Sequence, residues 1–142
     1  MQEDKTSIFV VDDHPLMRLS LVRLLSDAGY IVAGEACGIT EALKKIHYTR
    51  PNILIVDISL GDDSGFDLLK EVRLCFPRVR IIVYTMHDAS MYAARALKSG
   101  AAGFVTKGES PETLLKIILD VINGKLSVKS KENSIKIGRA HV

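Results

Sequence analysis

Five apolar, β-rich runs alternate along this chain with stretches of helical periodicity, and this alternation restricts the possible folds more than any other feature. The runs are continuously apolar, which is typical of parallel strands covered on both faces. Short connections between successive strand–helix units imply an open parallel sheet with helices on both sides. The predicted strands are residues 7–11, 30–37, 52–58, 79–85 and 101–106.

The stretches between the strands place apolar residues at helical spacing and start or stop at residues that favour helix termini. Thr40 is expected to cap the second helix, and Ser110, followed by Pro111, the last. The sequence therefore predicts an α/β, flavodoxin-like, doubly wound fold with a five-stranded parallel sheet in the order 2-1-3-4-5. The predicted helices are residues 15–28, 40–49, 65–76, 89–100 and 111–122.

The net charge of +2 is divided unevenly between the body of the chain and its end. Residues 125–142 hold five cations against Glu132, so the first 124 residues are mildly acidic, which argues against a nucleic-acid surface there. Residues 1–124 are predicted to form one domain, and residues 125–142 a basic linker or a vector-derived tail. No apolar run approaches the length of a membrane span, so we expect a cytoplasmic protein without a membrane partner.

Polar side chains stand where four of the five predicted strands end. Asp12 and Asp13 follow the first strand and Asp57 the third, while Thr85 ends the fourth and Lys107 follows the fifth. Singly, each has an ordinary interpretation as a turn residue, a strand-end hydroxyl or a solvated lysine. Because parallel strands end at one edge, beside the point where the strand order reverses, their coincidence predicts a functional site.

Such a cluster needs a counter-charge. Two carboxylates about 4 Å apart repel by roughly 4 kcal/mol at an effective dielectric constant near 20, so they must stay partly protonated, recruit a cation or splay apart. Hard oxygen ligands suit Mg²⁺. Lys107 can pair first with a carboxylate and then with a phosphoryl group, and Thr85 offers one donor. These groups are the parts needed to form an aspartyl phosphate.

The segments "VVDDHP", "ILIVDISLGDDSG", "IIVYT" and "GAAGFVTKG" resemble, in order and spacing, the receiver domains of two-component response regulators. The resemblance covers residues 7–124 and is closest to LuxR-type (NarL/FixJ-like) regulators. It implies that Asp57 accepts a phosphoryl group from a histidine kinase. It also implies Mg²⁺ ligation by Asp13 and Asp57 directly, by Asp12 mostly through water, and by the backbone carbonyl of Ser59.

The same resemblance implies that Lys107 and Thr85 hold the phosphoryl oxygens and that Thr85 swings inward as a switch. Phe104 stands at the aromatic switch position, although an ordinary core residue is the plainer interpretation. The resemblance further implies catalysis only of the domain's own phosphorylation and slow dephosphorylation. DNA would be bound only through a C-terminal domain absent from this chain. The candidate dimer surface is strand 101–106, the last helix and the helix 89–100, whose apolar face is expected to be Ala93, Ala94, Ala96 and Leu97.

The sequence departs from the family pattern at three places. Gly61 replaces a usual proline in the loop after Asp57, and Asp62 makes this loop more acidic. Met86, rather than a small residue, follows Thr85. Gly108 follows Lys107, where the family often has a cis-bonded proline.

Two other functions remain open. A phosphohydrolase with an aspartyl nucleophile would usually carry a second aspartate two residues after Asp57, where Ser59 stands instead. An interaction module with the receiver fold would never be phosphorylated. His14 is interpreted as an ordinary loop histidine and His87 as a residue without functional neighbours, and the two cysteines as reduced core thiols.

Overall fold

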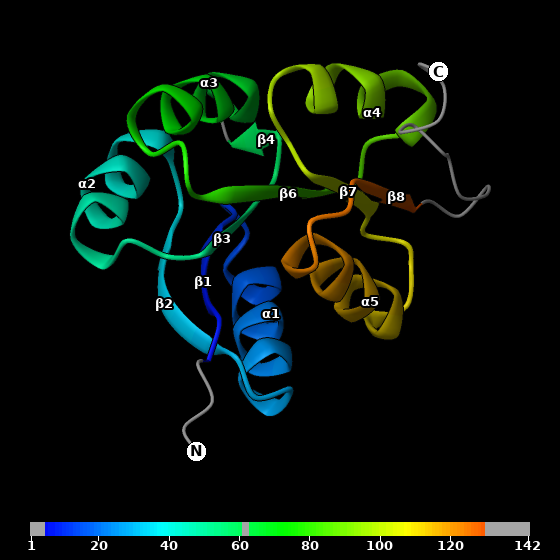
Figure 1. The fold of residues 1–142 in the computed structure, drawn as a ribbon, viewed down its shortest axis with the longest axis horizontal. Helices are drawn as coiled ribbons and strands as arrows, with labels where there is room; N and C mark the ends of the chain where they lie inside the picture. The colour runs from blue at the N-terminus through cyan, green and yellow to red at the C-terminus, as the bar shows by residue number, and fades with distance from the viewer. Residues whose placement is uncertain (1–4, 61–62, 130–142) are drawn as a thin grey trace.

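The computed structural model describes residues 5–60 and 63–129, which form a sheet with helices on both faces (Figure 1). Among the described residues, no helix combines the length and apolar character needed to cross a membrane. Gly61 and Asp62 of the expected acidic loop, and residues 130–142 of the expected tail, lie outside the described residues. The elements are β1 (Ser7–Val11), α1 (Pro15–Asp27), β2 (Ile31–Ala36), α2 (Ile39–Thr49), β3 (Ile53–Val56), β4 (Ser59–Leu60), β5 (Asp63–Ser64), α3 (Gly65–Cys75), β6 (Arg80–Thr85), α4 (Ala89–Lys98), β7 (Gly103–Thr106), α5 (Pro111–Ile122) and β8 (Ser127–Lys129).

The main sheet has the order β2-β1-β3-β6-β7-β8, and every neighbouring pair of strands is parallel. The first five positions confirm the predicted 2-1-3-4-5 order and the doubly wound fold. The sixth strand was not predicted: β8 pairs with β7 and buries Val128. The prediction of five strands is therefore wrong by one, and the sheet extends beyond residue 124. Three residues are too few to show a period, which is why the sequence did not indicate β8.

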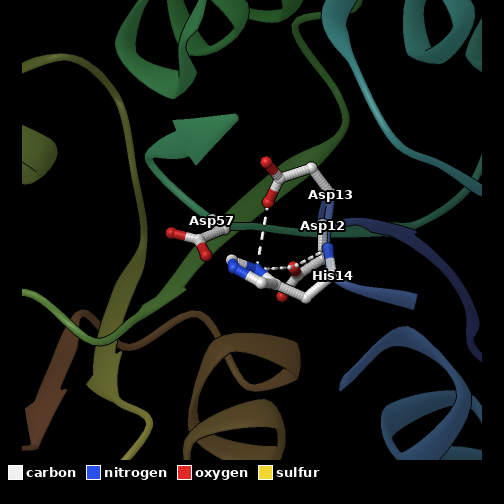
Figure 2. Close-up of side chains that lie close together, drawn as sticks. All are labelled: Asp12, Asp13, His14 and Asp57. Atoms are coloured by element: carbon white, nitrogen blue, oxygen red, sulfur yellow. Dashed lines mark hydrogen bonds and ion pairs between the residues drawn. The ribbon is translucent and has the colours of Figure 1, made fainter. Parts of the chain in front are cut away.

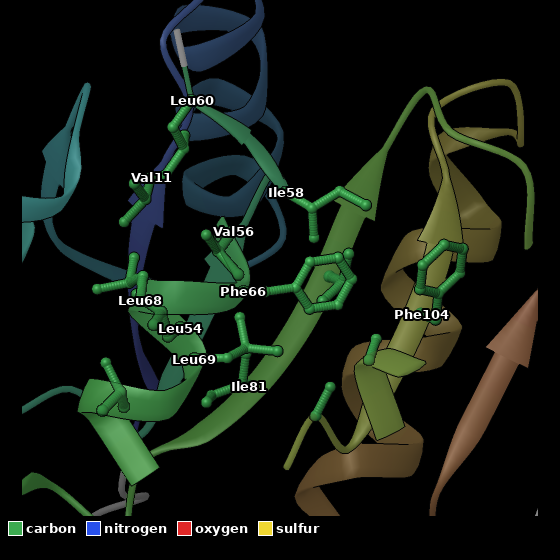
Figure 3. Close-up of a cluster of buried hydrophobic side chains, with 14 of the residues drawn as sticks. Val11, Leu54, Val56, Ile58, Leu60, Phe66, Leu68, Leu69, Ile81 and Phe104 are labelled. Carbon is green, nitrogen blue, oxygen red and sulfur yellow. The ribbon is translucent and has the colours of Figure 1, made fainter. Parts of the chain in front are cut away.

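Each face of the sheet carries its own helices and its own core. Leu54 and Val56 of β3 point toward α2, α3 and α4, whereas Ile53 and Ile55 point toward α1 and α5. Figure 1 shows the same division, and Figure 3 shows part of the first core around Phe66 and several strand residues. Burial of alternate residues on opposite faces explains why the strand sequences are apolar throughout.

Helix α4 is attached to the sheet mainly through methyl groups. Its buried residues are Ala89, Ala93 and Ala96, and Leu97 packs partly buried against the same core. Ala94, expected on this face, is exposed instead. Since each methyl group removes little area from water, α4 is anchored more weakly than α3, which buries Phe66 and three aliphatic side chains.

The helix termini correct two details of the sequence interpretation. Ser110 caps α5 as expected, since its Oγ accepts a hydrogen bond from the Thr113 N–H. Thr40 does not cap α2: the helix starts one residue earlier, after Gly38. Both cysteines are free but exposed, so their placement in the core was wrong.

Candidate functional site

The acidic residues of the site are held by backbone bonds at the carboxyl ends of β1 and β3. The Asp12 N–H donates to the Ala36 carbonyl of β2 at 3.1 Å, and the Asp57 N–H donates to Val11 of β1 at 3.0 Å. Asp12 and Asp57 therefore each extend the sheet hydrogen bonding by one residue beyond the end of their strands. This is the edge predicted from the parallel topology.

Lys107 lies between two of the acids and binds both. Its Nζ is 2.6 Å from Asp12 Oδ2 and 2.8 Å from Asp57 Oδ2, and the three side chains are only 2–3% exposed. The Lys107 N–H also donates to the Thr85 carbonyl at 2.7 Å, which fixes the start of the loop after β7. The structure thus brings together residues 95 and 50 positions apart in the chain, as the sequence predicted.

The charge on Lys107 is strongly favoured at this place. Burial alone would lower the pKa of its ammonium group. The hydrogen bonds that the ammonium donates to Asp12 and Asp57, together with the negative charges of these carboxylates, outweigh burial and raise the pKa above its usual 10.5. One ammonium group between two carboxylates still leaves an excess of negative charge. The negative charge that remains therefore favours the binding of a further cation at this site.

Asp13 and His14 lie beside Asp12 and Asp57 and complete the cluster (Figure 2). His14 Nδ1 lies 3.0 Å from Asp12 Oδ1 and 3.0 Å from Asp13 Oδ1. Asp13 Oδ1 is buried, yet within residues 5–60 and 63–129 it has no hydrogen-bond partner. A buried carboxylate oxygen without a donor is costly, and a cation is the partner that such an oxygen lacks.

These residues fit a divalent metal ion. One possible ligand atom from each of Asp12, Asp13, His14 and Asp57 lies within 4.8 Å of all the others. Carboxylates and water are the ligands that Mg²⁺ prefers, and the orphaned Asp13 Oδ1 supplies a position for it. Ser59 touches Asp57 through its N–H, which donates to Asp57 Oδ1 at 3.0 Å, while the ligand role of its carbonyl stays a prediction.

The two predicted switch residues are both fully buried. Thr85 Oγ1 accepts a hydrogen bond from the His87 N–H at 3.3 Å. Phe104 belongs to the core shared with α3 and α4, so its ring already points inward in this structure. Among the described residues all peptide bonds are trans, including the one between Lys107 and Gly108. Met86 is exposed rather than packed over Asp57.

His87 is a neighbour of the site that the sequence did not reveal. Its Nε2 lies 2.6 Å from Ser59 Oγ, and its ring centre lies 5.0 Å from that of Tyr92 on α4. The interpretation of His87 as isolated was therefore wrong. The contact joins Ser59 of β4 to the loop after β6, 28 positions away in the chain. The only hint in the sequence was the place of His87 two residues after the end of β6.

The doubly wound fold and the acidic cluster with its buried lysine define a class of protein, and comparison with known proteins agrees. The family model described as "Response regulator receiver domain" matches residues 8–119. The chain therefore belongs to the response regulator receiver domain family, and it is a receiver domain of a two-component response regulator.

Two relatives illustrate the range of similar sequences. The chain is 29% identical over 140 residues to a nitrate/nitrite response regulator protein homolog of Haemophilus influenzae, covering 98% of this chain and 67% of that protein. It is 32% identical over 111 residues to the chemotaxis protein CheY of Thermotoga maritima, covering 78% of this chain and 92% of CheY. Against the other regulators of similar sequence, such as UvrY of Escherichia coli, the chain spans 55–59% of their length.

The similar solved structures include LuxR-family regulators. A two-component response regulator of the LuxR family from Aurantimonas has a TM-score of 0.84 at 32% identity, with 91% of this chain and 92% of that chain covered. The isolated receiver domain of RcsB from Salmonella enterica serovar Typhimurium, solved with the phosphomimetic BeF₃⁻, has a TM-score of 0.81 at 26% identity, with 89% and 94% covered.

Proposed function

We propose that this receiver acts in the cytoplasm and accepts a phosphoryl group on Asp57 from the phosphohistidine of a histidine kinase. The observation that carries the proposal is the pair of contacts from Lys107 to Asp12 and Asp57. Beside them lies the buried Asp13 Oδ1, which accepts no hydrogen bond from the described residues. A carboxylate fixed by a buried ammonium group, next to carboxylate oxygens that can ligate a metal ion, is the arrangement that phosphoryl transfer to aspartate requires.

In the transfer, a carboxylate oxygen of Asp57 forms a bond to phosphorus while the bond from phosphorus to the kinase imidazole nitrogen breaks. The bonding electron pair leaves with that nitrogen. Lys107 is placed to follow the charge from the carboxylate to the phosphoryl oxygens, and the Ser59 N–H keeps the carboxylate oriented. Mg²⁺, held by Asp12, Asp13 and Asp57, would neutralise the charge that develops on the phosphoryl group.

Phosphorylation is proposed to shift an equilibrium that already exists in the unmodified domain. A phosphoryl group on Asp57 gives the Thr85 hydroxyl a strong acceptor, for which it would give up the His87 N–H. The loop from Thr85 to α4 would move with it, and α4 is weakly anchored. We therefore expect phosphorylation to act on the surface of α4, β7 and α5 and to promote homodimer formation there.

The experiment is incubation of the purified protein with phosphoramidate and Mg²⁺, followed by intact-mass spectrometry. A stable gain of one phosphoryl group, lost in Asp57→Asn and in excess EDTA but kept in the exposed control Asp67→Asn, supports the proposal. Rapid, repeated release of phosphate would support a phosphohydrolase instead. No mass gain at all would support an interaction module.

We further propose that the receiver controls a LuxR-type DNA-binding domain. The Aurantimonas neighbour is a LuxR-family regulator, and another RcsB structure at 25% identity, with a TM-score of 0.81 and 89% of this chain covered, contains RcsB dimers bound to DNA. The chain spans just over half of most of its regulator relatives, which leaves length for such a domain. DNA binding by this protein with its native downstream sequence, increased on phosphorylation, is the expected result.

A further inference from the structure

His14 lies directly beside the carboxylates of the candidate metal site. Its ring nitrogen Nδ1 is equally distant, at 3.0 Å, from one oxygen of Asp12 and one oxygen of Asp13. Figure 2 shows the imidazole facing both carboxylates, with Asp57 beside them. The residue is locally fixed, because its own N–H donates to Asp12 Oδ1 at 2.9 Å and Pro15 follows it at the start of α1.

A hydrogen bond explains only one of these two contacts. A ring nitrogen carries at most one proton, so one linear hydrogen bond from Nδ1 can reach Asp12 or Asp13, and the second contact is then an ion pair of a protonated ring or a contact without a shared proton. The bond to Asp12 has hydrogen-bond geometry, whereas Asp13 Oδ1 has no hydrogen-bond partner within the part of the chain that the structure describes. A single linear hydrogen bond therefore does not by itself explain why Nδ1 lies equally close to two carboxylate oxygens.

The spacing matches that of neighbouring ligands around one metal ion. Two ligand atoms at right angles around an octahedral ion, each about 2.1 Å from it, lie about 3 Å apart. Lys107 occupies the Oδ2 atoms of Asp12 and Asp57, which leaves Asp12 Oδ1 and Asp13 Oδ1, the two atoms that face His14. The three carboxylates exceed the one ammonium by two negative charges, the complement of a divalent cation.

We propose that His14 is a nitrogen ligand of the divalent ion at this site and that it gives the site an affinity for transition-metal ions beyond that of an all-oxygen receiver. The inference rests on the metal site of the proposed function and names a specificity-determining residue within it. Imidazole suits the later first-row ions, so Co²⁺ gains more than Mn²⁺ from a nitrogen ligand, whereas Mg²⁺ gains little from replacing an oxygen ligand by nitrogen. His14 thus affects which metal ion is bound more than whether Mg²⁺ is bound.

The test compares Co²⁺, Mn²⁺ and Mg²⁺ binding to the wild-type protein and to His14→Asn. Asparagine replaces the ring nitrogens by an amide whose carbonyl oxygen can still ligate Mg²⁺, and it is a favoured residue at a helix N-cap, so the variant retains the start of α1. His47→Asn, which changes an exposed histidine of α2, is the matched control. Circular dichroism checks that both variants are folded.

Calorimetric titration with Co²⁺ alone is expected to show an affinity about tenfold lower in His14→Asn, with Mg²⁺ affinity changed by less than about threefold. Pulsed electron paramagnetic resonance of bound Mn²⁺ is expected to show coupling to nitrogen in the wild type and in His47→Asn, and none in His14→Asn. Absence of nitrogen coupling in the wild type, or equal Co²⁺ affinity in His14→Asn, would overturn the inference.

The same titrations separate this inference from the proposed function. If Mg²⁺ binds and Asp57 is phosphorylated but Co²⁺ affinity does not depend on His14, only the role of His14 fails. If neither Mg²⁺ nor Co²⁺ binds the wild-type protein, the metal site itself fails, and the phosphoryl-transfer proposal fails with it.

Discussion

At the scale of single residues, the ammonium group of Lys107 determines how the site is held together. It is the shared partner of Asp12 and Asp57, and all three side chains are almost completely removed from water. Two carboxylates in such surroundings repel strongly unless a positive charge lies between them. The stability of the site and its readiness for a metal ion are therefore coupled through one side chain.

Replacement of Lys107 by methionine is expected to lower the free energy of unfolding by about 3 kcal/mol, because it leaves two buried carboxylates without their counter-charge. Urea denaturation without divalent ions measures the loss. The control Lys116→Met removes an exposed pair with Asp120, at 3.4 Å, and should change stability by less than about 0.5 kcal/mol. Equal effects of the two substitutions would contradict this account of the site.

The raised pKa of Lys107 also predicts how stability depends on alkaline pH. The folded state favours the charged form, so the contribution of Lys107 is complete below the unfolded pKa of 10.5 and is lost as pH rises through the higher folded pKa. The stability difference between the wild type and Lys107→Met should therefore shrink above this range. Denaturation curves of both proteins at a series of alkaline pH values provide the measurement, and a constant difference would refute the assignment.

At the scale of elements, the start of α3 is packed closely against Asp57, the residue proposed to accept the phosphoryl group. The Gly65 N–H donates to the Ile58 carbonyl at 2.8 Å. A Cβ atom at Gly65 would lie 2.5 Å from the Asp57 carbonyl oxygen and from Ile58 Cα, which are backbone atoms that cannot rotate away. The absence of a side chain at Gly65 thus allows α3 to begin directly over the end of β3.

Gly65→Ala is expected to move the backbone at Asp57, to destabilise the domain by about 1–3 kcal/mol and to slow phosphorylation. Gly38→Ala is the matched control, since no atom lies within 4 Å of a Cβ there and Gly38 has an extended φ of −159°. Thermal denaturation and the rate of mass gain with phosphoramidate measure the two effects. A normal phosphorylation rate in Gly65→Ala would show that the contact is not needed for the site.

Most of the helices, and most strands of the main sheet, were predictable because each has a recognisable pattern in its own residues. Several contacts between elements have no such pattern in the sequence. Continuous apolar runs identified β1, β3 and β6, and Ser110 with Pro111 identified the start of α5. Thr40 was misleading because Glu41, one residue on, instead accepts the Cys37 N–H at 3.0 Å and supports the start of α2 from inside the helix. Its bonds to Lys45 and Cys37 lower the pKa of Glu41 to about 2.

At the scale of the whole molecule, the topology accounts for the part of the site that the sequence predicted. Parallel strands end at one edge, so Asp12, Asp57 and Lys107 could be placed together from their positions after strands. The contacts of His14 and His87 depend on loop conformation, which no period in the sequence encodes. The sixth strand depends on a long-range pairing of only three residues with β7.

The pairing of the sixth strand, β8, with β7 predicts that the folded domain extends beyond residue 124. Val128 is buried in the core shared with Phe104, whereas Leu126, two residues earlier, is exposed. Val128→Ala is expected to lower the free energy of unfolding by about 1–2 kcal/mol, and Leu126→Ala by less than about 0.5 kcal/mol. Denaturation of the two variants decides the matter: equal effects would mean that β8 adds nothing to the fold and that the boundary near residue 124 holds.

The burial of Lys107 has a consequence for reagents that can react in two ways. Acyl phosphates donate their phosphoryl group to carboxylates and their acyl group to free amines. An amine that is protonated, enclosed and already bonded to two oxygens is a poor nucleophile, whereas exposed lysines such as Lys44 and Lys70 are open to acylation. We therefore expect an acyl phosphate at this site to react as a phosphoryl donor, and Lys107, which is proposed to assist that reaction, to be protected from acylation.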